Sequence, residues 1–326
     1  MRVLVTGAGA LLGQGIIRSL AKSQLEGLQI IAADPSPFSA GLYWTDERYL
    51  LPMAADPGFM DGLRRLIEKA RPDLIIPGTD AELMILAKNR ISLESNYGAK
   101  VLVSSPEVIE IADDKYKTFE FFRNNGFTPP ESCLPGGEDE LLARIGFPLI
   151  VKPRIGARSF GVRKVNNISE LKEAIRTTKS PVIQECVGTD EVEYTAGVIY
   201  FDGDCKASIV MRRDLRDGNT YRAYVDSSLE FNEQVKTFAR HLKPCGPANF
   251  QFRLSQGKVK VFEINGRFSG TTPLRMLAGF NEVEMCLRYL LLGEPVVQPS
   301  VKKVTILRHW SETVIDPESV ELIQQA

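Results

Sequence analysis

The sequence predicts an α/β protein that begins with a parallel sheet and carries an antiparallel hairpin near its end. Residues 2–34 read as a strand, a glycine-rich turn, a helix through Leu20 and a second strand that ends at Asp34. This βαβ start is typical of a Rossmann-like domain with a parallel sheet. Residues 249–265 instead alternate polar and apolar side chains on both sides of a turn at 255–258, which predicts a hairpin.

Composition limits the classes of function. The 326 residues suffice for two or three domains, and the net charge of -1 gives no global attraction to nucleic acid or to an anionic membrane. The five cysteines include no Cys-x-x-Cys pair, which argues against a zinc site and favours the cytoplasm. Only two histidines are present, so a histidine-based triad or metal site is not expected. We find no signal peptide and no apolar run long enough to cross a bilayer.

The polar face of the predicted hairpin is a candidate metal site. Gln251, Glu263 and Asn265 fall on one face because side chains alternate along a strand. All three offer oxygen atoms, which suit Mg²⁺ bound together with substrate phosphates. Arg267 follows two residues after Asn265 and supplies a cation. The alternative is the ordinary solvated face of an antiparallel hairpin.

Two segments of this hairpin resemble a known family. Gly-x-x-Asn-x-Gln-Phe and Phe-Glu-Ile-Asn-Gly-Arg-Phe-Ser are similar to the metal-binding core of the ATP-grasp superfamily, and most similar to one synthetase unit of the carbamoyl-phosphate synthetase large subunit. The resemblance implies that Gln251, Glu263 and Asn265 hold one or two Mg²⁺ ions on the phosphates of ATP, with Mn²⁺ as a substitute. The chain has Gly266 where the family usually has proline, and glycine keeps the turn feasible.

Further motifs follow in the order that this family shows. Lys115 lies in the first turn of a predicted helix, and Lys152 lies inside an apolar strand, where an unpaired ammonium is costly and a phosphate would be a suitable partner. By resemblance, both lysines contact phosphate, and Arg158 belongs to a mobile loop over the nucleotide. The resemblance also implies that main-chain groups near Glu185 and Val187 bind adenine. An acid, either Glu191 or Glu193, would bind ribose; the sequence leaves that choice open.

The resemblance implies an ATP-grasp fold in which two α+β subdomains enclose ATP. We expect a preparatory Rossmann-like domain over residues 1–112 and an N-terminal subdomain with the mobile loop over 113–186. A catalytic subdomain over 187–295 and a tail over 296–326 complete the chain. In the preparatory domain, Asp80 follows a strand and is expected to be the N-cap of the next helix.

The implied activity is that of a ligase. A carboxylate or bicarbonate attacks the γ-phosphate to give an acyl phosphate, which an amine or another nucleophile captures. Arg267 and Lys152 are the predicted catalytic residues, because phosphoryl transfer needs positioning and charge rather than covalent chemistry. The cation-rich segment 211–222 is expected to bind the carboxylate through Arg222, or less directly through Arg212 or Arg213. A homodimer or a partner subunit is compatible with the sequence.

Two other classes of function stay open. The turn Gly7-Ala8-Gly9-Ala10-Leu11-Leu12-Gly13 also resembles the start of extended short-chain dehydrogenases and epimerases, which bind NAD. That class needs a Tyr-x-x-x-Lys pentad, and the sequence contains none. A non-catalytic ATP-binding subunit that works only with a partner chain is the other alternative.

Overall fold

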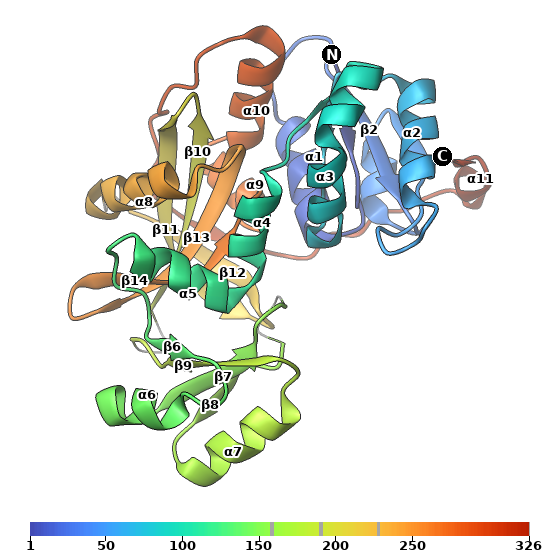
Figure 1. The fold of residues 1–326 in the computed structure, drawn as a ribbon. Helices are drawn as coiled ribbons and strands as arrows, with labels where there is room; N and C mark the ends of the chain where they lie inside the picture. Colours follow the sequence, from blue (N-terminus) through green and yellow to red (C-terminus); the bar gives the residue numbers. More distant parts are fainter. Residues whose placement is uncertain (157–159, 189–191, 227–228, 326) are drawn as a thin grey trace.

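The computed structural model describes residues 1–156, 160–188, 192–226 and 229–325, which build three sheets with helices packed on them (Figure 1). The N-terminal domain and the small sheet lie at opposite ends of the molecule, and a large antiparallel sheet lies between them (Figure 1). Within the described ranges, no helix is both long enough and apolar enough to cross a membrane.

The N-terminal domain is a parallel sheet in the order β16-β3-β2-β1-β4-β5, which confirms the predicted parallel start. Side chains alternate across β1: Val3 and Val5 pack toward α1, whereas Leu4 packs toward α2 and α3. Both faces of the sheet are therefore covered, as a parallel sheet requires. The elements are β1 (Arg2–Val5), α1 (Leu11–Leu20), β2 (Gln29–Asp34), η1 (Ala40–Trp44), β3 (Glu47–Leu50), α2 (Phe59–Ala70), β4 (Leu74–Ile76), α3 (Asp80–Tyr97) and β5 (Lys100–Val101).

The glycine-rich turn after β1 is packed tightly against its own domain. A Cβ atom on Gly13 would lie 2.2 Å from the carbonyl oxygen of Gly7, so only glycine permits this approach of helix to turn. The carboxylate of Asp34 at the end of β2 accepts hydrogen bonds from the backbone N–H of Gly9 at 2.7 Å and from the Ser39 hydroxyl at 2.6 Å. The hydrogen-bonding groups of the turn and of Asp34 are therefore paired with each other.

The small domain is a four-stranded antiparallel sheet in the order β6-β9-β7-β8, covered by α6 and α7. Two helices connect it to the N-terminal domain and pack on the large sheet. The elements are α4 (Pro106–Asp113), α5 (Lys115–Asn124), β6 (Ser132–Cys133), α6 (Glu138–Ile145), β7 (Leu149–Pro153), β8 (Arg163–Val165), α7 (Ile168–Thr177) and β9 (Pro181–Glu185).

The large sheet is antiparallel in the order β14-β13-β10-β11-β12-β15 and has a core on each face. Helix α8 packs on one face, and α9 and α10 fill the space between the other face and the N-terminal domain. The predicted hairpin is confirmed as β13 and β14. The elements are β10 (Glu193–Phe201), β11 (Asp204–Arg216), β12 (Asn219–Val225), α8 (Leu229–Leu242), β13 (Gly246–Ser255), β14 (Lys258–Asn265), α9 (Thr272–Leu277), α10 (Glu282–Leu287) and the π-helical turn η2 (Arg288–Leu292).

The C-terminal segment connects two of the sheets. Strand β15 (Val304–Leu307) pairs with β12, and β16 (Gln324–Gln325) pairs with β3 in the N-terminal domain, after the short helix α11 (Pro317–Glu321). The sequence predicted only a tail here. Strands this short depend on the sheets that they join rather than on their own pattern of side chains.

Candidate functional site

A cavity of about 360 Å³ lies between the small sheet and the large sheet. Its walls come from β7 and β9 on one side and from β10, β13 and β14 on the other. The sequence-predicted residues that line it are Lys115, Lys152, Glu185, Val187, Glu193, Arg213, Gln251 and Glu263. Most of the predicted nucleotide site is therefore in one place.

Lys152 is buried in this cavity, with 5% of its surface exposed. Its Nζ atom donates to Gln184 Oε1 at 2.7 Å and lies 5.5 Å from the centre of the Phe262 ring. Burial, followed by the neighbouring charge of Lys115, lowers the pKa of Lys152 to about 7. Among the residues that the structure describes, no carboxylate forms an ion pair with this amine. The described structure therefore gives this buried amine no directly paired carboxylate, and the charges of Glu263 and Glu193 only partly offset the effect of burial on its pKa.

Lys115 lies beside Lys152 at the start of α5 and is also buried. Its Nζ atom donates to the carbonyl oxygen of Gly156 at 2.7 Å. The preceding residue, Asp114, accepts hydrogen bonds from Tyr116 and Lys117 as the N-cap of the helix. Its carboxylate also pairs with Arg154 at the end of β7. The cap thus fixes the turn that carries Lys115.

The segment from Glu185 to Val187 lines the cavity where the chain leaves the small sheet. The Glu185 carboxylate accepts from Lys260 Nζ at 2.6 Å and from the backbone N–H of Glu131 at 2.9 Å. The Val187 carbonyl oxygen accepts from Arg253 at 3.3 Å. Because the acidic side chain is engaged, an adenine contact in this segment would fall to the main chain, as the sequence predicts.

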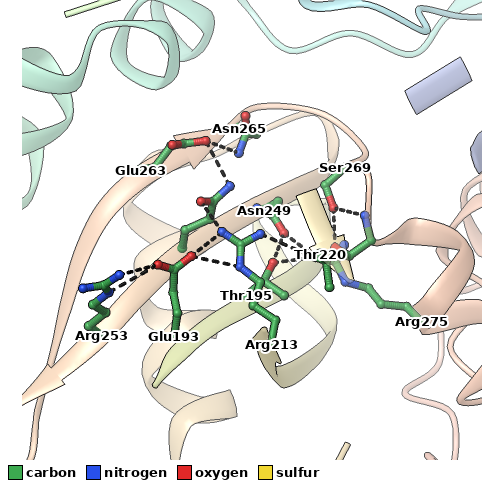
Figure 2. Close-up of polar contacts among 12 residues, drawn as sticks. Glu193, Thr195, Arg213, Thr220, Asn249, Arg253, Glu263, Asn265, Ser269 and Arg275 are labelled. Carbon is green, nitrogen blue, oxygen red and sulfur yellow. Dashed lines mark hydrogen bonds and ion pairs between the residues drawn. The ribbon is translucent and has the colours of Figure 1, made fainter. Parts of the chain in front are cut away.

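Glu193 lies at the start of β10 between two arginines (Figure 2). Its Oε1 atom accepts from Arg213 Nε at 3.0 Å, and its Oε2 atom accepts from Arg253 Nη2 at 3.0 Å. The two ion pairs satisfy the carboxylate within the protein. The other predicted ribose ligand, Glu191, lies outside the described residues, as does Arg158 of the predicted mobile loop.

The three predicted metal ligands converge on the hairpin. Gln251 lies opposite Glu263 in the register of β13 and β14. Glu263 Oε1 accepts from Gln251 Nε2 at 2.9 Å and from Asn265 Nδ2 at 3.3 Å, and Figure 2 shows Glu263 and Asn265 turned toward each other. Gln251 Oε1 accepts from Arg213 at 2.6 Å. Within the described part of the chain, no cluster of three or more His, Cys, Asp or Glu side chains is suited to a metal, so the hairpin offers one carboxylate and two amides.

Arg267 leaves the hairpin toward the N-terminal domain. Its guanidinium binds both carboxylate oxygens of Asp80, at 2.6 and 2.7 Å. Asp80 was expected to be the N-cap of its helix, and that expectation is wrong. Thr79 occupies the cap position, and Asp80 is the first residue of α3. The distant cation, rather than the local backbone, sets the orientation of the Asp80 side chain.

A second cavity of about 340 Å³ adjoins the first and shares Arg213, Gly218, Gln251 and Glu263 with it. It lies between the hairpin and the N-terminal domain and is lined mostly by polar residues. Other residues in its lining are Leu11, Thr79, Asp80, Asn219, Thr220, Asn249, Asn265, Arg267, Ser269, Thr271 and Arg308.

The arginines predicted to bind a carboxylate separate into two groups. Arg213 lies in the wall shared by both cavities. Arg212 lies over the Tyr224 ring at 3.7 Å, and Arg222 forms an ion pair with Asp214 at 3.6 Å with half of its side chain exposed. Within the described ranges, neither of these two is among the residues that line the first or the second cavity. Their role in binding substrate stays a prediction.

Two residues of the second cavity received no role from the sequence. Asn249 lies in the middle of β13, and an asparagine inside a strand is unfavourable enough to draw attention. Arg308 follows β15 and reaches the cavity only because β15 joins the large sheet beside β12. No local pattern could have indicated Arg308.

Comparison with protein families and known structures identifies the architecture. Residues 189–313 match the family described as "ATP-grasp in the biosynthetic pathway with Ter operon", and residues 3–102 match "PylC-like, N-terminal domain". The chain carries an ATP-grasp domain. The carbamoyl phosphate synthase large chain of Methanosarcina mazei is 24% identical over 303 residues, which cover 83% of this chain and 28% of that one. This ATP-grasp chain thus spans little more than a quarter of that relative.

Solved structures share the fold of this ATP-grasp protein. N5-carboxyaminoimidazole synthetase from Staphylococcus aureus, in complex with ADP, matches with a TM-score of 0.72 and 17% identity, over 92% of this chain and 79% of that one. The biotin carboxylase domain of 2-oxoglutarate carboxylase from Hydrogenobacter thermophilus, with MgADP, ADP and bicarbonate, matches with a TM-score of 0.68 and 19% identity, over 90% and 70%. The synthase, the synthetase and the carboxylase named above are enzymes.

Proposed function

We propose that this chain is an ATP-grasp ligase that uses Mg-ATP to activate a carboxylate as an acyl phosphate, which an amine or another nucleophile then captures. The observation that carries the proposal is the pair of adjoining cavities. One contains the buried amines of Lys115 and Lys152, the other is lined by hydrogen-bond donors, and Arg213, Gln251 and Glu263 form the wall that both share. This arrangement suits a transfer of phosphate from one cavity to the other.

ATP would occupy the cavity between the two antiparallel sheets. Lys152 lacks a carboxylate partner among the described residues, so the triphosphate would supply the counter-charge that its burial requires. Lys115 would bind the same phosphates, and the main chain from Glu185 to Val187 would bind adenine. Arg213 and Arg253 already donate to the two carboxylate oxygens of Glu193, so these oxygens would accept from the ribose hydroxyls in addition to the arginines. Glu191 and Arg158 keep their roles as predictions from resemblance.

The hairpin fits a magnesium ion that is bound together with ATP. Glu263 supplies one charged oxygen, and turning over the amide of Asn265 would present its oxygen in place of the N–H group that Glu263 now accepts. The orientation of the Gln251 amide is set by Arg213, which donates to its oxygen, so Gln251 would bind the metal through an oxygen shared with that guanidinium. A single carboxylate with two amides suits Mg²⁺, which keeps waters and binds phosphate oxygens. Mn²⁺ accepts the same ligands and is proposed as a substitute. When bound, the metal would supply positive charge at the phosphates.

The first step of the proposed reaction transfers no proton, so it needs neither a general acid nor a general base. A carboxylate oxygen attacks the γ-phosphorus of ATP, the bond from that phosphorus to the β,γ-bridging oxygen breaks, and ADP leaves with the electron pair. The nucleophile then attacks the acyl carbon, inorganic phosphate leaves, and an amine loses one proton. Lys152 and Arg267 would stabilise negative charge on the phosphoryl group, and Asp80 holds the Arg267 guanidinium in place.

The identity of the partners is also part of the proposal. We infer a small-molecule carboxylate, bicarbonate included as a candidate, and a small nucleophile as co-substrate. Because the chain covers 28% of its M. mazei relative, a homodimer or a separate subunit that delivers the nucleophile agrees with the proposal. All five cysteines are free thiols, which agrees with the reducing cytoplasm that we propose as its location.

The dehydrogenase alternative is disfavoured by the first turn of the N-terminal domain. In NAD-binding Rossmann domains, an acid at the end of the second strand binds the ribose hydroxyls. Here the corresponding Asp34 already accepts hydrogen bonds from Gly9 and Ser39.

A non-catalytic ATP-binding subunit would need the first cavity but would have no use for the polar groups that line the second cavity.

The function is tested by a screen for ADP release. Purified protein with Mg-ATP is offered bicarbonate, amino acids and other small carboxylates, each with and without ammonium or an amine. We expect at least one carboxylate to stimulate ADP release, and hydroxylamine to trap the acyl phosphate as a hydroxamate. Mg-ATP binding without ADP release under any condition would favour the non-catalytic subunit instead.

A further inference from the structure

Asn249 lines the second cavity and has a buried N–H group with no acceptor in the described structure. It is 1% exposed, and its Oδ1 atom accepts from the Thr195 hydroxyl at 2.8 Å and from Arg275 Nη2 (Figure 2). A guanidinium only donates hydrogen bonds, so the atom that faces Arg275 must be the oxygen. The amide orientation is therefore fixed, and Nδ2 has no hydrogen-bond partner within the described residues.

A buried ion pair holds this amide in place. Arg275 and Glu282 are both fully buried, and Arg275 Nη1 donates to the two carboxylate oxygens at 2.9 and 3.1 Å. A Cβ atom on Gly197 would lie 2.5 Å from Arg275 Nη1, so the strand beneath has no side chain at this point. The Arg275–Glu282 pair fixes the Asn249 amide, and the Nδ2 donor of that amide has no acceptor among the described residues. A fixed donor that lacks an acceptor is expected where a ligand binds without rearranging the protein.

Arg308 lines the same cavity and also has a donor without an acceptor in the described structure. Its backbone N–H donates to Tyr221 at 2.9 Å, which continues the pairing of β15 with β12. Its Nη2 atom donates to the carbonyl oxygen of Gly270, and its Nη1 atom is buried without a partner in the described structure. Burial lowers the pKa of Arg308, and the nearby positive charge of Arg18 lowers it further. Among the described residues, this cation also forms no ion pair with a carboxylate.

The size and lining of the cavity indicate the class of ligand. About 340 Å³ lies within the usual range for organic ligands and far exceeds the space that bicarbonate needs. The two groups without partners are donors, so the ligand must bring acceptors, and a carboxylate brings two oxygens. Leu11 and Leu12 provide only a small apolar patch in an otherwise polar lining.

We propose that Asn249 Nδ2 and Arg308 bind the carboxylate of a polar organic acid, of amino-acid size or larger, in the second cavity. The inference rests on the proposed function and deepens it, because the shared wall of Gln251 and Glu263 would bring that carboxylate next to the metal and phosphates. It assigns the carboxylate to Arg308 rather than to Arg222, whose ion pair with Asp214 lies outside both linings as far as the structure describes them.

The test separates binding from turnover. Amino acids, hydroxy acids, dicarboxylates and bicarbonate are titrated calorimetrically into the full chain saturated with magnesium and a non-hydrolysable ATP analogue. The same acids are assayed for ADP release. The variants at the proposed site are Arg308→Met, Arg308→Lys and Asn249→Asp. Asn249→Asp keeps an oxygen that accepts from Arg275 but loses the N–H donor. Arg222→Met tests the alternative that Arg222 binds the carboxylate. Arg240→Met removes a surface ion pair to Asp204 and is the control.

We expect an organic acid to bind better than bicarbonate, and Arg308→Met to raise its Kd or KM on the order of 10- to 100-fold, the range for a charge-assisted hydrogen bond. In Arg308→Lys the Kd or KM of the acid should recover part of the way toward the wild-type value. In Asn249→Asp the acid should bind more weakly than to the wild type, because two carboxylates then repel each other. In all of these variants the KM for ATP should stay within about twofold of the wild type. The melting temperature of Arg308→Met should change little, because the variant loses the hydrogen bond of Nη2 to Gly270 but also removes a partly buried charge that has no counter-charge among the described residues.

Three results would overturn the inference: no acid in the panel binds, bicarbonate binds as well as every organic acid, or Arg222→Met raises the KM while Arg308→Met does not. Failure of the proposed function has a different signature. In that case the acid binds and Arg308→Met abolishes its binding, but no ADP is released.

Discussion

Two of the basic side chains that are buried in the described structure, Arg275 and Lys152, have opposite surroundings. Arg275 is fully buried beneath the large sheet and is neutralised by the equally buried Glu282 at 2.9 Å. Lys152 is nearly as buried in the first cavity, but among the described residues it forms no ion pair: its Nζ atom donates to the neutral oxygen of Gln184 and lies over the Phe262 ring. A buried charge is costly without a counter-charge, so Arg275 has its counter-charge within the fold, whereas a ligand would supply one to Lys152. The difference separates a structural cation from a functional one.

This contrast predicts the largest effect for the loss of the partner of Arg275. Glu282→Gln leaves a fully buried guanidinium without a counter-charge, and we expect the free energy of unfolding to fall by about 3–5 kcal/mol. Urea unfolding monitored by circular dichroism measures it. Glu284→Gln is the matched control on the same helix, because the pair of Glu284 with Arg288 is partly exposed and should contribute less than about 1 kcal/mol. Equal losses in the two variants would contradict the distinction.

Lys152→Met should show the reverse pattern. We expect turnover to fall on the order of 10²- to 10³-fold, because the variant removes charge at the phosphates. The free energy of unfolding without nucleotide should stay the same or rise at pH 8, since folding then no longer buries a lysine whose pKa is lowered from 10.5 to about 7. Lys172→Met on the exposed face of α7 is the control. A less stable variant with full turnover would make Lys152 a structural residue.

The lowered pKa of Lys152 predicts a smaller effect on nucleotide binding. In the free protein this amine is largely neutral above its pKa of about 7 and charged below it. Bound phosphates favour the ammonium, so ATP binding should take up close to one proton at pH 8.5 and almost none at pH 6. The affinity for ATP should fall by up to about tenfold per pH unit above pH 7.

Calorimetry in buffers of different ionisation enthalpy measures this proton uptake. Lys152→Met should lose the difference between the two pH values. An equal uptake in the variant and the wild type would place the titrating group elsewhere.

The sequence predicted the parts of the candidate site whose side chains also form a recognisable local pattern. Alternation along residues 249–265 gave the hairpin and the shared face of Gln251, Glu263 and Asn265, and a lysine in an apolar strand marked Lys152. The pairing of Arg267 with Asp80 joins residues from two domains, so local reasoning assigned Asp80 to a helix cap. The second cavity was harder still, because its donors depend on contacts that are distant in the sequence.

Asn249 and Arg308 illustrate that limit. The role of Asn249 depends on Arg275 and Thr195, which fix its amide from two other elements. Arg308 reaches the cavity through a four-residue strand whose pairing is set by β12. Neither arrangement leaves a periodic pattern in the sequence. The arginine-rich segment 211–222 does leave a visible pattern, which is why it drew the prediction of a substrate site.

The most direct test of the account is a calorimetric titration of ATP, with and without Mg²⁺, into the wild type and Glu263→Gln. We expect one ATP per chain, with an affinity at least about tenfold higher when Mg²⁺ is present, because in the proposed site Glu263 binds the metal at the phosphates. In Glu263→Gln most of that dependence on Mg²⁺ should disappear while the fold is kept. The absence of ATP binding, tight binding of NAD instead, or an unchanged dependence on Mg²⁺ in the variant would contradict the account.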